Sequence, residues 1–250
     1  MDSNADEEAG PKYQPQEAIP DMGLSASLRR LHFMSTDMFM GQQLTNLDLV
    51  DSFLTDLEYQ VLREYFETDR TPAEAHFLGA QSQMWLFAAY ELVRTWRQRA
   101  NGVTKLAQTG KLEQRLAELK AEDDGRPHPG RHGRIEGIET VLANPALLNV
   151  IERQSRALHI PFKRLEFLRV SLAKHEVSGQ QRAAAYFPGY GRINKYCGAL
   201  DYELENGKYI IGYLNRRDVA EELRHLDLDG EPPTNEELQA FDSFMDGKEG

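Results

Sequence analysis

The chain has 250 residues and a mass of 28.5 kDa, enough for one large domain or two small ones with a buried core. Apolar residues make up 40% and charged residues 28%, which excludes both a disordered polymer and a membrane protein. Its one cysteine, Cys197, cannot form an internal disulfide, and the first twenty residues hold no apolar block of a secretory signal. We therefore expect a soluble, cytoplasmic protein.

Charge is segregated along the chain. Residues 1–93 carry a net charge of −11, residues 94–217 carry +9, and residues 218–250 carry −9. A basic middle could meet a polyanion such as RNA. Alternatively, the acidic ends neutralise it within one molecule or across a dimer, and the charge pattern does not choose between the two.

The N-terminal part predicts a disordered tail followed by helices. Residues 1–23 combine acids with proline and glycine and are expected to be a disordered acidic tail. A helical bundle domain is expected over residues 24–178. Its first long helix is indicated by apolar residues spaced three or four apart, at Leu44, Leu47, Val50, Leu54, Leu57, Val61 and Tyr65. Phe53, Leu62 and Phe66 widen this stripe, which predicts packing against more than one neighbour.

A second long helix is predicted from Pro72 to about Arg99. Thr71 is placed to cap it, Pro72 suits the first helical position, and Asn101-Gly102 should end it. Residues 84–90 are apolar on every side, as in a central helix of a bundle. Shorter helices are expected to follow up to residue 178, interrupted by a Pro/Gly-rich loop over residues 123–133.

After residue 179 the pattern changes from helix to strand. Residues 200–205 alternate apolar and acidic side chains, and Asn206-Gly207 predicts a hairpin with a two-residue turn. Asn215 should cap the next helix, so residues 179–230 are expected to form a β-hairpin plus helix packed on the bundle. Thr234 should cap a short terminal helix within residues 231–250. The predicted fold class is mainly α: a multi-helix bundle with a small C-terminal β-hairpin and helix.

Most enzyme and metal-site patterns are absent from the sequence. There is no glycine-rich phosphate loop, dinucleotide fingerprint, zincin pair or paired-cysteine site, so no cofactor and no metal are expected. His128 and His132 could flank a metal, but the arginines beside them favour a solvated loop. Cys197 lacks a positioned base in the sequence, which favours an ordinary half-buried cysteine over a nucleophile.

A basic and aromatic segment precedes and overlaps the predicted hairpin. Arg182, Tyr190, Arg192 and Lys195 could hold phosphates and stack unpaired bases of a nucleic acid. Tyrosines at alternate strand positions also fit a half-buried sheet face, so cross-strand packing is the competing interpretation.

Two arginine–histidine pairs lie in the late helices, Arg169 with His175 and Arg153 with His159. With the two long helices before them, residues 25–178 resemble the HEPN group of all-helical domains. The resemblance implies metal-independent RNA cleavage, usually in a dimer, with the histidine as general acid or base and the arginine stabilising phosphate charge. Arg169 is followed by Val170, which departs from the polar residue that this group prefers.

Three functional hypotheses follow. The leading one is a regulatory protein that acts through protein–protein interaction or self-association, with the apolar faces of the two long helices forming a homo-oligomer. The alternative is a HEPN-like endoribonuclease of a defence or toxin type. The third is an RNA-binding protein without catalysis.

Overall fold

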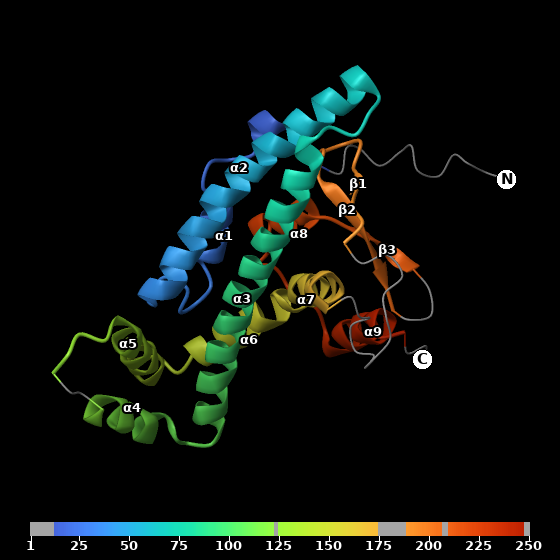
Figure 1. Cartoon of the computed structure of the whole chain (residues 1–250). Helices are drawn as coiled ribbons and strands as arrows, with labels where there is room; N and C mark the ends of the chain where they lie inside the picture. Colours follow the sequence, from blue (N-terminus) through green and yellow to red (C-terminus); the bar gives the residue numbers. More distant parts are fainter. Residues whose placement is uncertain (1–12, 123–124, 175–188, 207–209, 248–250) are drawn as a thin grey trace.

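The computed structural model describes residues 13–122, 125–174, 189–206 and 210–247 (Figure 1). Over these residues the chain is mainly helical and carries a small antiparallel sheet near the C-terminus, which confirms the predicted fold class. None of the described helices is long and apolar enough to cross a bilayer.

The N-terminal segment is more ordered than predicted. It contains a 3-10 turn, η1 (Gln16–Ala18), and helix α1 (Gly23–Leu28). The expected tail over residues 1–23 is wrong from Tyr13 onward, because the Tyr13 ring is buried and its hydroxyl donates to Asp218 at 3.0 Å. A contact 205 residues away in sequence gives no local signal, and this explains the error.

The two long helices, α2 (Met38–Thr68) and α3 (Glu74–Gln108), pack against each other along one side of the molecule (Figure 1). Asp37 caps α2 by accepting from the backbone N–H groups of Phe39 and Met40, each at 2.9 Å.

The predicted limits of the second long helix need correction at both ends. Helix α3 begins at Glu74 without a side-chain cap, so Thr71 does not act as predicted. It also passes through Asn101 and Gly102, which are exposed, because buried Val103 continues the packed side of the helix.

Two shorter helices, α4 (Leu112–Ala121) and α5 (Pro129–Ala143), form a hairpin at the end of α3. Part of the predicted 123–133 loop is therefore helical, since Pro129 occupies the first turn, where its missing N–H costs nothing. The α5 backbone lies close to the segment before α2. A Cβ added to Gly133 would lie 2.9 Å from the Thr36 carbonyl oxygen, and one on Gly137 would lie 3.0 Å from the Phe33 ring.

Helices α6 (Leu147–Ala157) and α7 (His159–Lys174) complete the predicted bundle and pack on α3. The sheet that follows has the order β1 (Arg192–Ile193), β2 (Leu200–Glu205), β3 (Ile210–Leu214), with antiparallel neighbours. One continuous set of buried apolar residues runs through the helices and the sheet, so the sheet shares the core of the bundle.

The hairpin between β2 and β3 differs from the predicted two-residue turn. Glu205 pairs with Ile210, so four residues separate the paired strands. Asn206 is buried, and its amide donates to the Phe244 carbonyl oxygen at 3.4 Å instead of forming a tight turn.

The last two helices, α8 (Arg216–Arg224) and α9 (Asn235–Met245), both begin at predicted caps. Asn215 and Asp218 form a capping box for α8, and Thr234 and Glu237 form one for α9. Helix α8 packs on α1 and α7, while α9 packs on α7.

Candidate interaction surface

The inner side of α2 carries acidic side chains that face α1 and α8. Asp51 and Glu58 are 2% and 0% exposed, respectively. The Nε and Nη2 atoms of Arg216 donate to the two carboxylate oxygens of Glu58, both at 2.7 Å, and its Nη1 donates to Asp51. Arg224 forms a second ion pair with Asp51. Arg216 and Arg224 of α8 and Asp51 and Glu58 of α2 thus form a buried network of ion pairs that joins the two helices.

Charge inside this network is matched rather than isolated. Burial alone would lower the pKa of Arg216, but Glu58 and Asp51 outweigh it and raise the pKa of the guanidinium, which stays charged. The Arg216 guanidinium also lies 5.3 Å from the centre of the Trp85 ring on α3. Trp85 in turn donates its indole N–H to the Leu47 carbonyl at 3.0 Å, so the network reaches the contact between α2 and α3.

The outer side of the same helices carries two stripes of side chains at heptad spacing. The α2 stripe is Phe39, Gln43, Asn46, Val50 and Phe53, and the α3 stripe is Phe77, Gln81, Met84, Ala88 and Glu91. In each stripe the steps are four, three, four and three residues, the spacing by which helices pack nearly parallel or antiparallel to other helices. We call the two stripes together the α2–α3 face.

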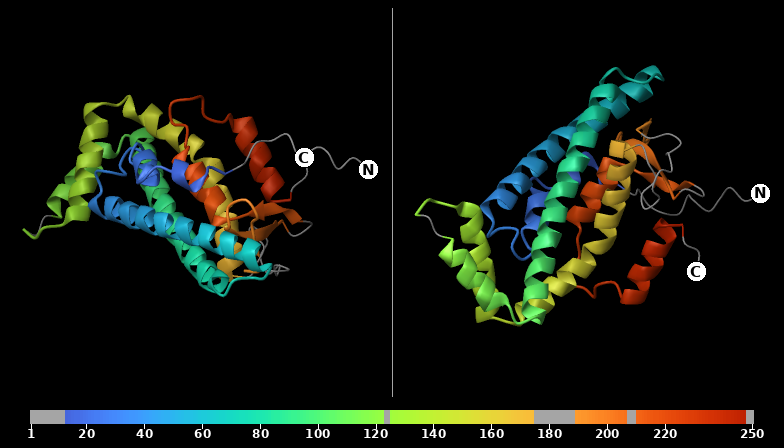
Figure 2. Two further views of the ribbon diagram at one scale, coloured as in Figure 1. Left: turned by 90° about the horizontal axis from the view of Figure 1, so that it is seen from above. Right: turned by 60° about the horizontal axis from the view of Figure 1, so that its bottom comes forward.

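Large apolar side chains of the α2–α3 face are exposed. Phe53 on α2 is 55% exposed and Met84 on α3 is 63% exposed. The prediction that α2 packs against more than one neighbour is confirmed, since α2 contacts α1, α3 and α5, and Leu62 is buried. Phe53 and Phe66 do not take part as expected, because both are mostly exposed. In the left view of Figure 2, α2 and α3 lie along one side of the molecule, with α8 and α9 on the other. At one end of the face the α5 backbone lies against Phe39, since a Cβ on Gly130 would lie 3.3 Å from its ring, while among the described residues Val50, Phe53, Phe77 and Met84 are exposed.

The α2–α3 face is nearly free of charge. Residues 38–55 contain only Asp48 and Asp51 as charged side chains, both buried on the inner side, and residues 75–90 contain none. At the overall share of 28%, these two ranges would carry about ten charged side chains. Depletion of charge together with exposed aromatic and methionine side chains is the composition of a protein–protein interface core.

A groove of about 340 Å³ runs between the two stripes. Trp85 and Leu47 form its buried floor, while Val50 and Met84 form apolar walls. Gln43, Asn46 and Gln81 provide amide groups at its edges, and Glu91 at one end is paired with Arg94 at 2.5 Å. The groove offers apolar contact with a few hydrogen-bonding groups and no unpaired charge of its own.

The arginine–histidine pairs of the predicted RNA-cleavage site lie in different surroundings. The Arg169 guanidinium stacks on the Tyr90 ring at 4.8 Å, and His175 lies outside the described residues. Arg153 donates to the Gly230 carbonyl at 3.0 Å, and Nε2 of His159 lies 2.8 Å from Oδ1 of Asp242. Arg153 and His159 thus each contact the C-terminal segment, at Gly230 and at Asp242. RNA cleavage stays a prediction.

Three residues of the predicted nucleic-acid site are described, and they lie in β1 or within three residues of it. Arg192 on β1 pairs with Glu203 on β2 at 3.0 Å, and its guanidinium lies 5.8 Å from the Tyr213 ring centre. Tyr190 and Lys195 are exposed, and Arg182 lies outside the described residues. The contacts of Arg192 are cross-strand contacts, as the competing interpretation expects, and nucleic-acid binding stays a prediction.

The single thiol is more deeply buried than the half-buried cysteine predicted. Cys197 is fully buried, and burial together with the nearby Glu58 carboxylate raises the pKa of its thiol to about 12. It is therefore unreactive at neutral pH. Next to it, Gly198 has a φ of +79°, and a Cβ there would lie 1.9 Å from the Glu58 carbonyl oxygen, so only glycine fits.

His128 and His132 lie at the start of α5, where Lys120, Arg126 and Arg131 line the same hollow. His128 is exposed in the non-helical segment before α5, as expected, whereas His132 lies in the first turn of α5 and is also exposed. Within the described ranges, no group of three or more His, Cys, Asp or Glu side chains is arranged to hold a metal ion.

Comparison with family models, with curated proteins and with solved structures finds no match for this chain. The functional interpretation therefore depends on the geometry described above.

Two features of this surface were not predicted from the sequence. The buried acids Asp48, Asp51 and Glu58 step by three and seven residues, a period that could have shown that they share one side of α2. The heptad spacing of the α2–α3 face was hidden because three of its ten residues are amides and one is an acid.

Proposed function

We propose that this protein acts through self-association, and that a second copy docks on the α2–α3 face to form a homodimer. The observation that carries the proposal is the pair of exposed stripes at heptad spacing on adjacent helices, in which Glu91 is the one charged side chain. A two-helix surface of this kind is completed when a second helical hairpin packs on it, giving a four-helix arrangement.

The order of residues in the α2 stripe supports a second copy as the occupant. In an antiparallel pairing of α2 with α2 of the partner, Asn46 would meet its own counterpart and Phe39 would meet Phe53. Interfaces with two-fold symmetry require such self-complementarity. An amide at the centre of an apolar seam favours one register, because shifting the helices leaves it without a partner.

Charge at the two ends of the surface supports the antiparallel orientation. Residues 60–74, beyond one end, carry a net charge of −2, and residues 91–105, beyond the other, carry +3. An antiparallel dimer places the acidic end of one copy beside the basic end of the other, whereas the parallel arrangement places like charges together. In the proposed dimer, these acidic and basic ends of the two copies would therefore attract each other.

The first test measures molecular mass by sedimentation over a range of protein concentrations. We expect wild type to dimerise and Val50→Arg to raise the dissociation constant by about 100-fold or more, because an unpaired guanidinium would be buried in the seam. Ser52→Arg is the matched control, since Ser52 is exposed on the same helix but outside the stripe. A wild type that stays monomeric, or a control as disruptive as Val50→Arg, would overturn the proposal.

The second test examines the symmetry. Asn46→Cys is expected to form cross-linked dimers with a short bis-maleimide, and Ser52→Cys is not, because only residue 46 would lie near the two-fold axis. Native Cys197 is buried and should not react. Equal cross-linking of the two variants would contradict the antiparallel arrangement.

A further inference from the structure

A second surface lies on the far side of the molecule, where the C-terminal segment crosses α6. Residues 227–245, which we call the C-terminal strap, contain six acidic side chains and no lysine or arginine. The strap begins with a turn in which Asp227 accepts from the N–H groups of Asp229 and Gly230, continues through Pro232 and Pro233 without regular secondary structure, and ends in α9.

The strap is held mainly by polar contacts from α6 and its neighbours. Arg153 donates to the Gly230 carbonyl at 3.0 Å, and Arg156 donates twice to the Pro233 carbonyl, at 3.0 and 2.6 Å. His159 contacts Asp242 at 2.8 Å, and Arg30 pairs with Asp229 at 2.5 Å. The two arginines of α6 lie one helical turn apart and bind backbone carbonyls three residues apart.

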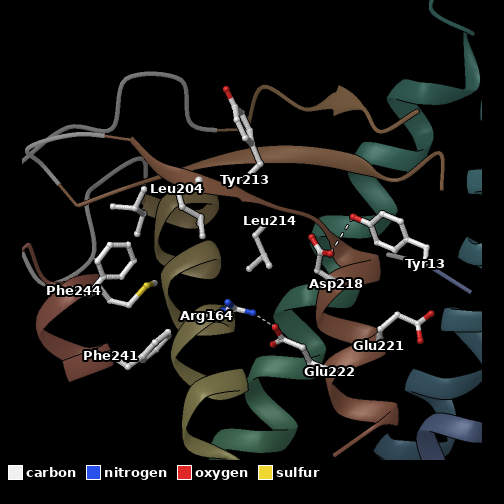
Figure 3. Close-up of a pocket in the computed structure, with 13 residues that line it drawn as sticks. Tyr13, Arg164, Leu204, Tyr213, Leu214, Asp218, Glu221, Glu222, Phe241 and Phe244 are labelled. Carbon is white, nitrogen blue, oxygen red and sulfur yellow. Dashed lines mark hydrogen bonds and ion pairs between the residues drawn. The ribbon is translucent and has the colours of Figure 1, made fainter. Parts of the chain in front are cut away.

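Apolar packing of the strap is limited. Leu228 is partly buried against the core and Met245 is the one buried residue of α9, while Phe244 is 50% exposed. A cavity of about 310 Å³ separates α9 from the sheet, with Phe241 and Phe244 on one side and Leu204 and Leu214 on the other (Figure 3). Segments with few buried apolar contacts open locally at low free-energy cost.

Among the residues that the structure describes, the arginines of α6 bind no carboxylate by a direct hydrogen bond. Arg153 and Arg156 donate to neutral carbonyl oxygens. Hydrogen bonds from Thr234 lower the pKa of the Glu237 carboxyl in the strap, and the charge of Arg156 helps to lower it from longer range. A guanidinium binds a carboxylate more strongly than a carbonyl, because both partners are then charged. Arg97, beneath this region on α3, has a buried Nη1 without a hydrogen-bond partner.

We propose that this side of α6 is a docking site for acidic, proline-containing peptides in extended conformation, and that the C-terminal strap is its intramolecular competitor. The strap shows the ligand chemistry directly: backbone carbonyls for Arg153 and Arg156, and a carboxylate for His159. An external peptide competes with a tethered segment whose effective concentration is in the millimolar range, so the closed chain binds weakly. Loosening the strap frees the site. This surface is separate from the α2–α3 face.

The experiment uses the full chain and a fluorescent peptide with the sequence of residues 226–247. Thr234→Ala removes the α9 cap, and Asp242→Asn weakens the contact with His159. We expect the peptide to bind the doubly substituted chain about tenfold or more tightly than wild type, measured by fluorescence anisotropy at low salt. Adding Arg153→Ala and Arg156→Ala to the doubly substituted chain should abolish this increase in peptide affinity.

Two controls test whether binding depends on the acids of the peptide and on opening of the strap. A peptide with its acids replaced by amides should bind more weakly, and hydrogen exchange should show faster exchange in α9 of the loosened chain with α2 and α3 unchanged. Equal peptide affinity for wild type and the loosened chain, or binding that survives loss of both arginines, would overturn the proposal. Monomer and dimer forms should bind the peptide equally, so failure of the dimer proposal leaves this test intact.

Discussion

Two sides of α2 have opposite chemistry: acidic side chains are buried on one of them, and large apolar side chains are exposed on the other. The inner side holds Asp51 and Glu58, buried under arginines of α8, while the outer side holds Val50 and Phe53, exposed. A surface helix of a globular protein ordinarily buries its apolar stripe and exposes its charges. In α2 the apolar leucines occupy the contact with α3, the acids are paired within the fold, and a second apolar stripe is exposed. The comparison teaches that the charged side chains of α2 stabilise the fold of the single chain, whereas its exposed apolar side chains contribute little to it.

The largest effect is expected where the inner side is broken. Glu58→Ala leaves Arg216 and Arg217 buried without their shared carboxylate and should lower the free energy of unfolding by about 3–5 kcal/mol. Urea denaturation measures the change. Pairing Glu58→Met with Arg216→Met should cost less than the sum of the single substitutions, because the two opposite charges are removed together, while Arg217 keeps Glu221 and Asp51 keeps Arg224 as ion-pair partners. Additive losses would show that the two charges act independently.

A smaller effect is expected at the start of α2, where Asp37 caps the helix and pairs with Arg99. Burial would raise the pKa of Asp37, but hydrogen bonds from Met40 and Arg99 outweigh it and lower the pKa. The stabilisation is therefore complete above the ordinary aspartate pKa of about 3.9 and is lost as pH falls through the lower folded value. Asp37→Asn should cost about 2 kcal/mol at pH 7 and much less near pH 2, measured by thermal unfolding.

The smallest effect is expected on the outer side. Leu49→Gln and Phe53→Gln should change the unfolding free energy of the monomer by about 0.5 kcal/mol or less, because these side chains are 59% and 55% exposed. Urea denaturation at a concentration below the dimer dissociation constant measures it. A loss as large as that of Glu58→Ala would show that the outer side supports the monomer, and the contrast between the two sides would fail.

The parts of the fold set by local chemistry were predictable from the sequence. Asn215 and Thr234 cap their helices as expected, since a capping box is complete within four residues. The limits of α3 and the β2–β3 turn were not, because buried Val103 and buried Asn206 are held by contacts with distant segments.

The candidate surface was predictable in outline only. Self-association through the two long helices was expected from their apolar stripes, yet Leu44 and Leu54 of the predicted stripe face inward and are buried. Sequence periodicity shows that residues share a side of a helix and does not show which side is covered. That choice is made by the arginines of α8, more than 150 residues away from their partners on α2.

Gly133 and Gly137 allow the α5 backbone to lie directly against the segment before α2, at the Thr36 carbonyl and the Phe33 ring, with no side chain of α5 between them. A complete substitution scan of α5 should therefore give an uneven map of tolerance. Positions facing water would accept nearly any residue that favours helix, whereas a narrow line through these two glycines would accept none with a larger side chain. Insertions would be tolerated poorly for the same reason, because one extra residue rotates that line by about 100° and presents a bulky group to the Thr36 carbonyl.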